Sequence, residues 1–244
     1  MRREIHKWWS PRLNKDMEIA CYGHYGFALL MFPTAAADYL EYERFQLIDS
    51  IRPFIEQGKM KVYSINSINS ESWLNRNMHP RAKSIRHQQY NAYVTEEVVP
   101  FIYNHCNGRV PIVTTGASLG ALHSANTFFR RPDLFHGTIP MSGLYDLTAY
   151  SGGYLDEDAY FNSPVHYLQN LHDDYWLPLL RHRGQHIHIL TGQGAYEDPS
   201  GSVRLSHILS AKGIPHELDL WGYDMRHDWP TWRAMLPYML ATRF

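Results

Sequence analysis

The sequence lacks the features of a membrane or exported protein. It has no apolar run of the roughly 18 residues that a membrane-spanning helix needs; the longest candidate, residues 27–32, has the length of a strand. No apolar segment follows the positive charges near the N-terminus, so the pattern of a secretory signal is missing. The two cysteines, Cys21 and Cys106, lie too far apart for a metal-type pair. We therefore expect two free thiols in a cytoplasmic protein without a membrane partner.

The chain also lacks an excess of charge of either sign. It has 23 Lys and Arg against 24 Asp and Glu, which gives no reason to expect nucleic acid or an anionic membrane as a partner. It contains no internal repeat, no linker-like tract and no Gly-x-Gly-x-x-Gly or phosphate loop, so no cofactor is predicted. With 44% hydrophobic residues over 244 positions, the composition predicts one folded domain over residues 1–244.

Strand-like and helix-like segments alternate along the chain. The alternation predicts an α/β fold with a mainly parallel central sheet and helices on both faces. The first two strands should be antiparallel, because too few residues separate them for a crossover. Residues 148–180, rich in Tyr, Asp, Asn and Gly, interrupt the rhythm and are expected to form a small insertion over the active site. Strands are expected at 18–21, 27–33, 61–68, 110–114, 137–142, 187–191 and 217–221, and helices at 42–57, 87–105, 121–129, 203–212 and 230–240.

One segment carries a motif with chemical meaning. An apolar strand at 110–113 leads into Gly116-Ala-Ser118-Leu-Gly120, and a helical segment of small residues follows. Strand, sharp turn and helix form the setting of a nucleophile elbow, in which the serine hydroxyl projects above the edge of a sheet. A Cβ at either glycine would collide with a neighbouring element as the turn tightens. Ser118 is therefore the candidate nucleophile.

A serine nucleophile needs a base and an acid. In this fold the acid and then the histidine follow the serine along the chain, each after a later strand. His227 stands in the loop after the last predicted strand, at the same sheet edge as the elbow. The loop after the preceding strand holds two adjacent carboxylates, Glu197 and Asp198. We prefer Glu197 as the acid, because Asp198 before Pro199 suits a helix start.

Two backbone N–H groups are needed to bind an oxyanion. The residue after the nucleophile, Leu119, should supply one from the start of its helix. The loop after an early strand should supply the other. Pro33 has no N–H, so Thr34 or Ala35 is the expected donor. Three clustered histidines lack further ligands at a suitable spacing, and no metal site is predicted: His182, His186 and His188.

The motifs resemble a serine esterase family that includes esterase D, enterochelin and feruloyl esterases, and mycolyltransferases. The resemblance runs from about residue 29 to the C-terminus and implies an α/β-hydrolase fold with a triad at Ser118, Glu197 and His227. The chain departs from the family's commonest acid pattern, an aspartate three residues after a strand-ending glycine. The matching stretches are Gly116-Ala-Ser-Leu-Gly-Ala-Leu, Arg131-Pro-Asp-Leu-Phe, Met141-Ser-Gly-Leu-Tyr-Asp and His227-Asp-Trp-Pro-Thr-Trp.

The sequence therefore predicts a serine hydrolase that acts on a small-molecule carboxylic ester. Two alternatives use the same scaffold. Acyl transfer to an alcohol other than water needs the same residues, and a binding protein could retain the fold with a silent site. The sequence specifies neither the ester nor the oligomeric state.

Overall fold

One eight-stranded sheet organises the chain. The computed structural model describes all 244 residues, Met1 to Phe244. The strand order is β1-β2-β4-β3-β5-β6-β7-β8, with β1/β2 and β2/β4 antiparallel and the other neighbours parallel. The strands are β1 (Arg3–Ser10), β2 (Lys15–Tyr22), β3 (Phe27–Phe32), β4 (Met60–Ile65), β5 (Ile112–Ala117), β6 (Gly137–Met141), β7 (His188–Thr191) and β8 (Glu217–Leu220).

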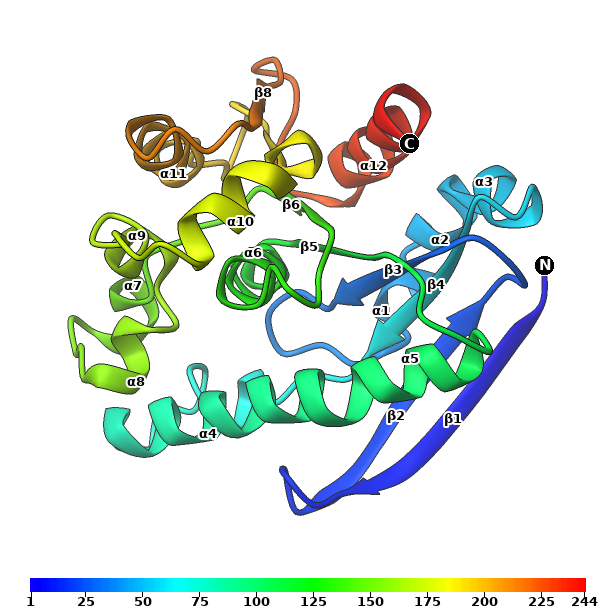
Figure 1. Cartoon of the computed structure of the whole chain (residues 1–244), viewed down its shortest axis with the longest axis horizontal. Helices are drawn as coiled ribbons and strands as arrows, with labels where there is room; N and C mark the ends of the chain where they lie inside the picture. Colours follow the sequence, from blue (N-terminus) through cyan, green and yellow to red (C-terminus); the bar gives the residue numbers. More distant parts are fainter.

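Helices cover both faces of this sheet (Figure 1). The N-terminal helices are α1 (Glu41–Arg44), α2 (Leu47–Ser50), α3 (Arg52–Glu56), the 3₁₀ turn η1 (Asn69–Glu71), α4 (Pro80–Tyr93), the π-helical turn η2 (Val94–Val98) and α5 (Val99–His105). The remaining helices are α6 (Leu119–Arg130), α7 (Thr148–Ser151), α8 (Glu157–Tyr160), α9 (Pro164–Tyr167), α10 (Trp176–Arg183), the 3₁₀ turn η3 (Gly184–His186), α11 (Ser200–Ala211) and α12 (Trp229–Arg243). No helix combines the length and hydropathy that crossing a bilayer would require.

The core lies in two layers, one on each face of the sheet. A cluster of 32 buried residues packs one face against α4 to α6 and α11, with side chains such as Ile102, Phe128 and Leu205. A second cluster of 21 buried residues packs the other face against α1 to α3 and α12, through Ile51 and Met235 among others. Burial of this apolar surface is the main force that holds the three layers together. The predicted α/β class, with a mainly parallel sheet between helices, is confirmed.

Several elements differ from the prediction in detail. The first predicted strands, β2 and β3, do run in opposite directions, but β4 lies between them. An additional edge strand, β1, pairs with β2. The single helix predicted over 42–57 is three short helices, because Gln46 adopts a left-handed conformation (φ 61°) between the first two. The helix predicted over 87–105 begins earlier, at Pro80, and continues through Pro100, with the π-helical turn η2 directly before α5 (Figure 1).

The interrupting segment is helical and contacts the elbow helix. Residues 148–180 form α7 to α9 and the start of α10. Tyr150 and Ala159 from this segment pack in a small apolar cluster with Leu119 and Leu122 of α6. This segment therefore lies against the residue that follows Ser118.

Candidate active site

The strained turn at Ser118 is the central feature of the site. Ser118 follows β5 directly and has φ 57° and ψ −122°, which places a non-glycine residue at positive φ. Such a conformation is costly and persists only where the surroundings enforce it. The next residue begins α6, so the strand–turn–helix context predicted from the sequence is present.

Both glycines of the motif are required by close backbone approaches, of α6 to Gly116 and of β3 to Gly120. A Cβ at Gly116 would lie 2.4 Å from the carbonyl oxygen of Gly120, and a Cβ at Gly120 would lie 2.3 Å from that of Phe32. The buried Tyr42 from α1 reinforces this contact: its hydroxyl donates to the Phe32 carbonyl at 2.6 Å and accepts from the Ala117 N–H at 3.0 Å. The elbow is thus fixed by packing from β3 and α1.

The structure brings Glu197 and His227 together. Glu197 Oε2 lies 3.1 Å from His227 Nδ1, and the Glu197 side chain is 1% exposed. Two backbone bonds join their loops: the Gly194 N–H donates to the Met225 carbonyl at 2.8 Å, and the His227 N–H donates to the Ala195 carbonyl at 3.0 Å. The pair is therefore held by the backbone as well as by its own contact.

Asp198 takes the other role that the sequence suggested for it. Its side chain is exposed, and Oδ1 accepts a hydrogen bond from the Ser200 N–H at 3.0 Å, at the start of α11. A carboxylate that accepts from a first-turn N–H stabilises the beginning of a helix. Of the two adjacent acids, only Glu197 contacts His227.

Two residues that the sequence analysis did not place in the site orient the Glu197 carboxylate. Ser142, which follows β6 at positive φ (52°), donates its hydroxyl to Glu197 Oε1. The Trp232 indole N–H in turn donates to Ser142 Oγ at 3.0 Å, and its ring stands edge-on to the His227 ring. Each oxygen of this buried carboxylate therefore has a partner. Ser142 directly follows a strand that ends at the same sheet edge as the elbow, which was its only signal in the sequence.

No hydrogen bond in the structure joins Ser118 Oγ to His227. Catalytic hydrogen bonds are often long or poorly aligned in structures without substrate and tighten in the complex. The main surface cavities also lie elsewhere, lined by other residues than Ser118, Glu197 and His227. Leu119, the residue after Ser118, is buried in an apolar cluster with Leu122 and Trp73.

The two predicted donors on the β3–α1 loop differ in their availability. The Thr34 N–H already donates to Glu41 Oε2 at 2.8 Å, and the Thr34 hydroxyl donates to the same carboxylate. Burial raises the pKa of Glu41, although both bonds from Thr34 oppose that rise. The Ala35 N–H makes no hydrogen bond within the protein, and Asn69 Nδ2 holds the loop by donating to the Ala35 carbonyl at 2.7 Å. Of the two N–H groups, that of Thr34 is therefore occupied by Glu41, and that of Ala35 is free.

Leu119 is the other residue that the sequence predicts as a backbone donor. It is the first residue of α6, and the first N–H groups of a helix have no partner within the helix.

One set of three potential metal ligands, Glu4, His6 and His105, lies between β1 and the end of α5. That cluster is at the edge of the sheet, four strands away from β5.

Comparison with known proteins identifies the family. The family described as Putative esterase matches residues 59–242. The chain therefore belongs to this esterase family, which confirms the resemblance drawn from its motifs and the enzyme class, a serine esterase. No curated protein sequence matches the chain.

Solved structures show the same fold at low sequence identity. A ferulic acid esterase superposes with a TM-score of 0.75 at 16% identity, covering 98% of this chain and 96% of that one. An S-formylglutathione hydrolase from Agrobacterium tumefaciens superposes with a TM-score of 0.75 at 12% identity, covering 98% of this chain and 93% of that one. MPT51 (FbpC1) from Mycobacterium tuberculosis superposes with a TM-score of 0.74 at 14% identity, covering 99% of this chain and 97% of that one.

Proposed function

We propose that this esterase hydrolyses small carboxylic esters through a triad of Ser118, His227 and Glu197. The observation that carries the proposal is the conjunction of two features: a serine at positive φ in a strand–helix turn, and a buried Glu197 carboxylate in contact with the partly exposed His227 after the later strands. Family membership supports the reaction class, and the geometry supports these residues as its machinery.

The reaction begins when Ser118 Oγ attacks the ester carbonyl carbon while His227 Nε2 takes its proton. Glu197 accepts from Nδ1–H, which fixes the imidazole tautomer and stabilises the imidazolium. The tetrahedral oxyanion accepts hydrogen bonds from the Leu119 and Ala35 N–H groups. Collapse breaks the bond to the leaving alcohol, which receives the proton from His227. Water, deprotonated by His227, then attacks the acyl-enzyme carbonyl. The bond to Ser118 Oγ breaks as Oγ takes that proton back from His227, and the acid is released.

The acyl group would lie beside α7, where the partly exposed Tyr150 packs against the buried apolar cluster next to the elbow. Leu119 and Leu122 belong to α6, while Trp73 and Tyr150 come from the η1 region and α7. Apolar and aromatic side chains next to a nucleophile favour an apolar or aromatic acyl group. We therefore propose that p-nitrophenyl butyrate and methyl ferulate are turned over with a higher kcat/KM than p-nitrophenyl formate.

The test compares wild type with Ser118→Ala in p-nitrophenyl ester hydrolysis. Wild type should release p-nitrophenol, and the variant should fall by a factor of about 10³ or more. Adding an alcohol acceptor and measuring the acid and ester products distinguishes hydrolysis from acyl transfer. Wild-type protein without turnover on any of these esters would instead support a silent binding site and contradict the proposal.

A further inference from the structure

The loop that carries the proposed oxyanion donor Ala35 has almost no side chain that can hold it in place. Its residues 33–37, which we call the donor loop, read Pro-Thr-Ala-Ala-Ala, and an alanine side chain forms no hydrogen bond. Thr34 bonds to Glu41, but Ala35 and Ala36 are exposed. The direction of the Ala35 N–H therefore depends on bonds that other segments make to the backbone of this loop.

Asn69 supplies two of these bonds. It is the first residue of η1, is fully buried, and donates through Nδ2 to the carbonyl oxygens of Thr34 at 3.1 Å and Ala35 at 2.7 Å. Ser67, from the same segment, donates its hydroxyl to the Ala37 carbonyl at 2.6 Å. The segment that follows β4 therefore holds the middle and the end of the donor loop.

His123 fixes the orientation of the Asn69 amide. Its Nε2 lies 2.8 Å from Asn69 Oδ1, and because an amide oxygen only accepts, Nε2 carries the proton and donates. Burial lowers the pKa of His123 to about 4, so the ring is neutral at pH 7. Phe32 stacks on this ring with centroids 6.2 Å apart, and Tyr90 meets it edge-on. Both ends of the Asn69 amide therefore have fixed partners.

The Asn69–His123 contact joins the two elements that bear the proposed oxyanion donors. His123 lies on α6, four residues and about one helical turn after Leu119. The helix backbone thus relates the His123 ring directly to the Leu119 N–H. Through Asn69, the same ring is bonded to the donor loop. An oxyanion hole requires donors that are fixed in advance at the place where charge develops.

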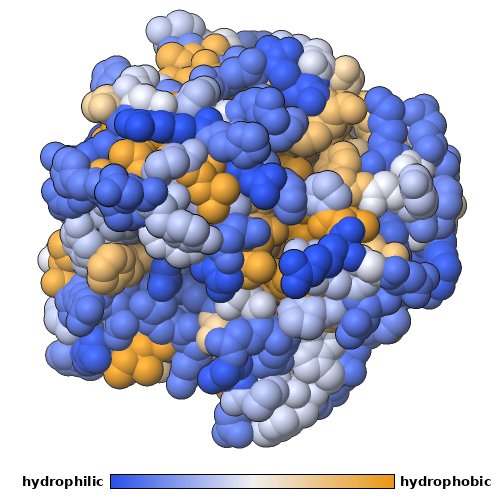
Figure 2. Space-filling view, in the orientation of Figure 1, coloured by the Kyte–Doolittle hydropathy of each residue, from blue (hydrophilic) through white to orange (hydrophobic).

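The burial of this polar pair is itself unusual. Hydrophilic side chains cover most of the surface in Figure 2, whereas Asn69 and His123 are 0% and 2% exposed. Two apolar side chains of similar shape can replace a buried hydrogen-bonded pair at little cost in stability. Water can satisfy the carbonyls of the donor loop, because this loop is partly exposed. Stability alone therefore does not require an amide and an imidazole at these positions.

We propose that Asn69 is a positioning residue of the oxyanion hole. Its amide, oriented by His123, fixes the Ala35 N–H in the place it needs beside the Leu119 N–H. This inference rests on the proposed function, because it takes these two N–H groups as the donors to the oxyanion. A displacement of about 1 Å at a reacting centre can cost a factor of about 10² in rate. The role of Asn69 should therefore appear in kcat rather than in KM.

Steady-state hydrolysis of p-nitrophenyl butyrate by Asn69→Ala and His123→Leu tests this role. Loss of one oxyanion donor costs a factor of about 10² to 10³ in kcat, and a displaced donor should cost part of that factor. We expect kcat to fall at least about tenfold in both variants, with KM within about threefold of wild type. His123→Gln retains an N–H donor toward Asn69 and should restore kcat to within about threefold of wild type.

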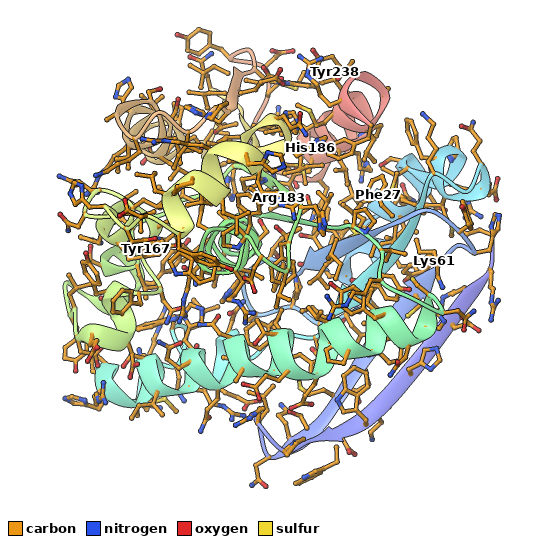
Figure 3. All side chains as sticks on the ribbon, viewed as in Figure 1. Phe27, Lys61, Tyr167, Arg183, His186 and Tyr238 are labelled. Atoms are coloured by element: carbon orange, nitrogen blue, oxygen red, sulfur yellow. The ribbon has the colours of Figure 1, made fainter.

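The matched control is Asn126→Ala, on the same helix. Asn126 is also fully buried, but it donates to Asn162 at 2.8 Å and accepts from Tyr167 at 3.1 Å. Tyr167 is the last residue of α9, at the left of Figure 3, so these bonds lead to the 148–180 segment and not to the donor loop. The control should lose stability in urea unfolding and keep kcat within about twofold of wild type.

Amide hydrogen exchange, measured by mass spectrometry, gives a second readout that needs no substrate. Peptides that cover residues 33–37 should exchange faster in Asn69→Ala and His123→Leu than in wild type. The same peptides should be unchanged in Asn126→Ala. Unchanged exchange in both Asn69→Ala and His123→Leu would overturn the proposal.

The kinetic outcomes separate this inference from the proposed function. If wild type hydrolyses the ester and Ser118→Ala does not, the function stands, and wild-type kcat in both Asn69→Ala and His123→Leu overturns only the positioning role. An equal fall in kcat for Asn126→Ala would also overturn it. If wild type turns over no ester, the proposed function fails, and exchange alone decides whether Asn69 holds the loop. Circular dichroism checks folding; if Asn69→Ala does not fold, His123→Leu decides by the same criteria.

Discussion

Replacing Glu197 by glutamine should greatly reduce kcat while the fold is retained. The buried Glu197 carboxylate contacts His227 through one oxygen and accepts from Ser142 through the other. An amide of the same shape keeps the packing but removes the charge that stabilises the imidazolium. Removing the negative charge from a triad in this way costs kcat a factor of about 10³ to 10⁴. That factor corresponds to about 4 to 5 kcal/mol in the activation free energy.

The assay is initial-rate hydrolysis of p-nitrophenyl butyrate over a range of substrate concentrations. The loss should appear in kcat, with KM changed little, because the charge acts on the transition state. Asp198→Asn is the matched control, since Asp198 is exposed and contacts only the start of α11. A larger loss for Asp198→Asn than for Glu197→Gln would refute the assignment of the acid.

Three further perturbations test other parts of the structure. Gly120→Ala places a Cβ 2.3 Å from the backbone oxygen of Phe32, so urea unfolding should show a loss of about 1 to 3 kcal/mol. Ser142→Ala removes the donor to the Glu197 carboxylate and the acceptor of the Trp232 N–H, so urea unfolding should show a loss of about 1 to 3 kcal/mol and kcat should fall as the carboxylate loses its fixed orientation. Burial opposes ionisation of Asp156, but hydrogen bonds from its neighbours hold its pKa at about 2, below its ordinary value of 3.8. Its stabilising effect is therefore present above pH 4 and lost as the pH falls toward 2, so Asp156→Asn should flatten the acid limb of the stability profile measured by circular dichroism.

The elbow could be predicted from the sequence because its signal is local. Two glycines four residues apart, a preceding strand and a following helix are all read from one short segment. The order of acid and histidine after later strands then limited the partners to a few positions. In an α/β fold the loops that follow successive parallel strands lie at the same sheet edge. This explains why the order of residues in the sequence was enough to pair Glu197 with His227.

Other features could not be predicted because they depend on contacts between distant segments. Ser142 and Trp232 are 90 positions apart, and no pattern in either segment of the sequence indicates their hydrogen bond. The same holds for Glu41, whose carboxylate occupies the Thr34 N–H and so favours Ala35 as the donor. In each case the sequence supplied the residue type, and only the packed sheet supplied its partner.

The edge strand β1 was not predicted from the sequence, for a different reason. Its residues alternate between exposed and partly exposed positions, so no fully apolar face marks it as a strand. It is defined by pairing with β2 along its whole length. Edge strands of this kind carry charged side chains that discourage pairing with other molecules. The polar pattern that hides β1 in the sequence thus suits its position in the sheet.

The central claim, that Ser118 is the nucleophile, is tested most directly by intact-protein mass spectrometry after treatment with a fluorophosphonate. Such a probe forms a covalent bond only with an activated serine. Wild type should gain the mass of one phosphonyl group, located at Ser118 by peptide mapping, and Ser118→Ala should gain none. Labelling of another serine, or equal labelling of the Ser118→Ala protein, would contradict the account.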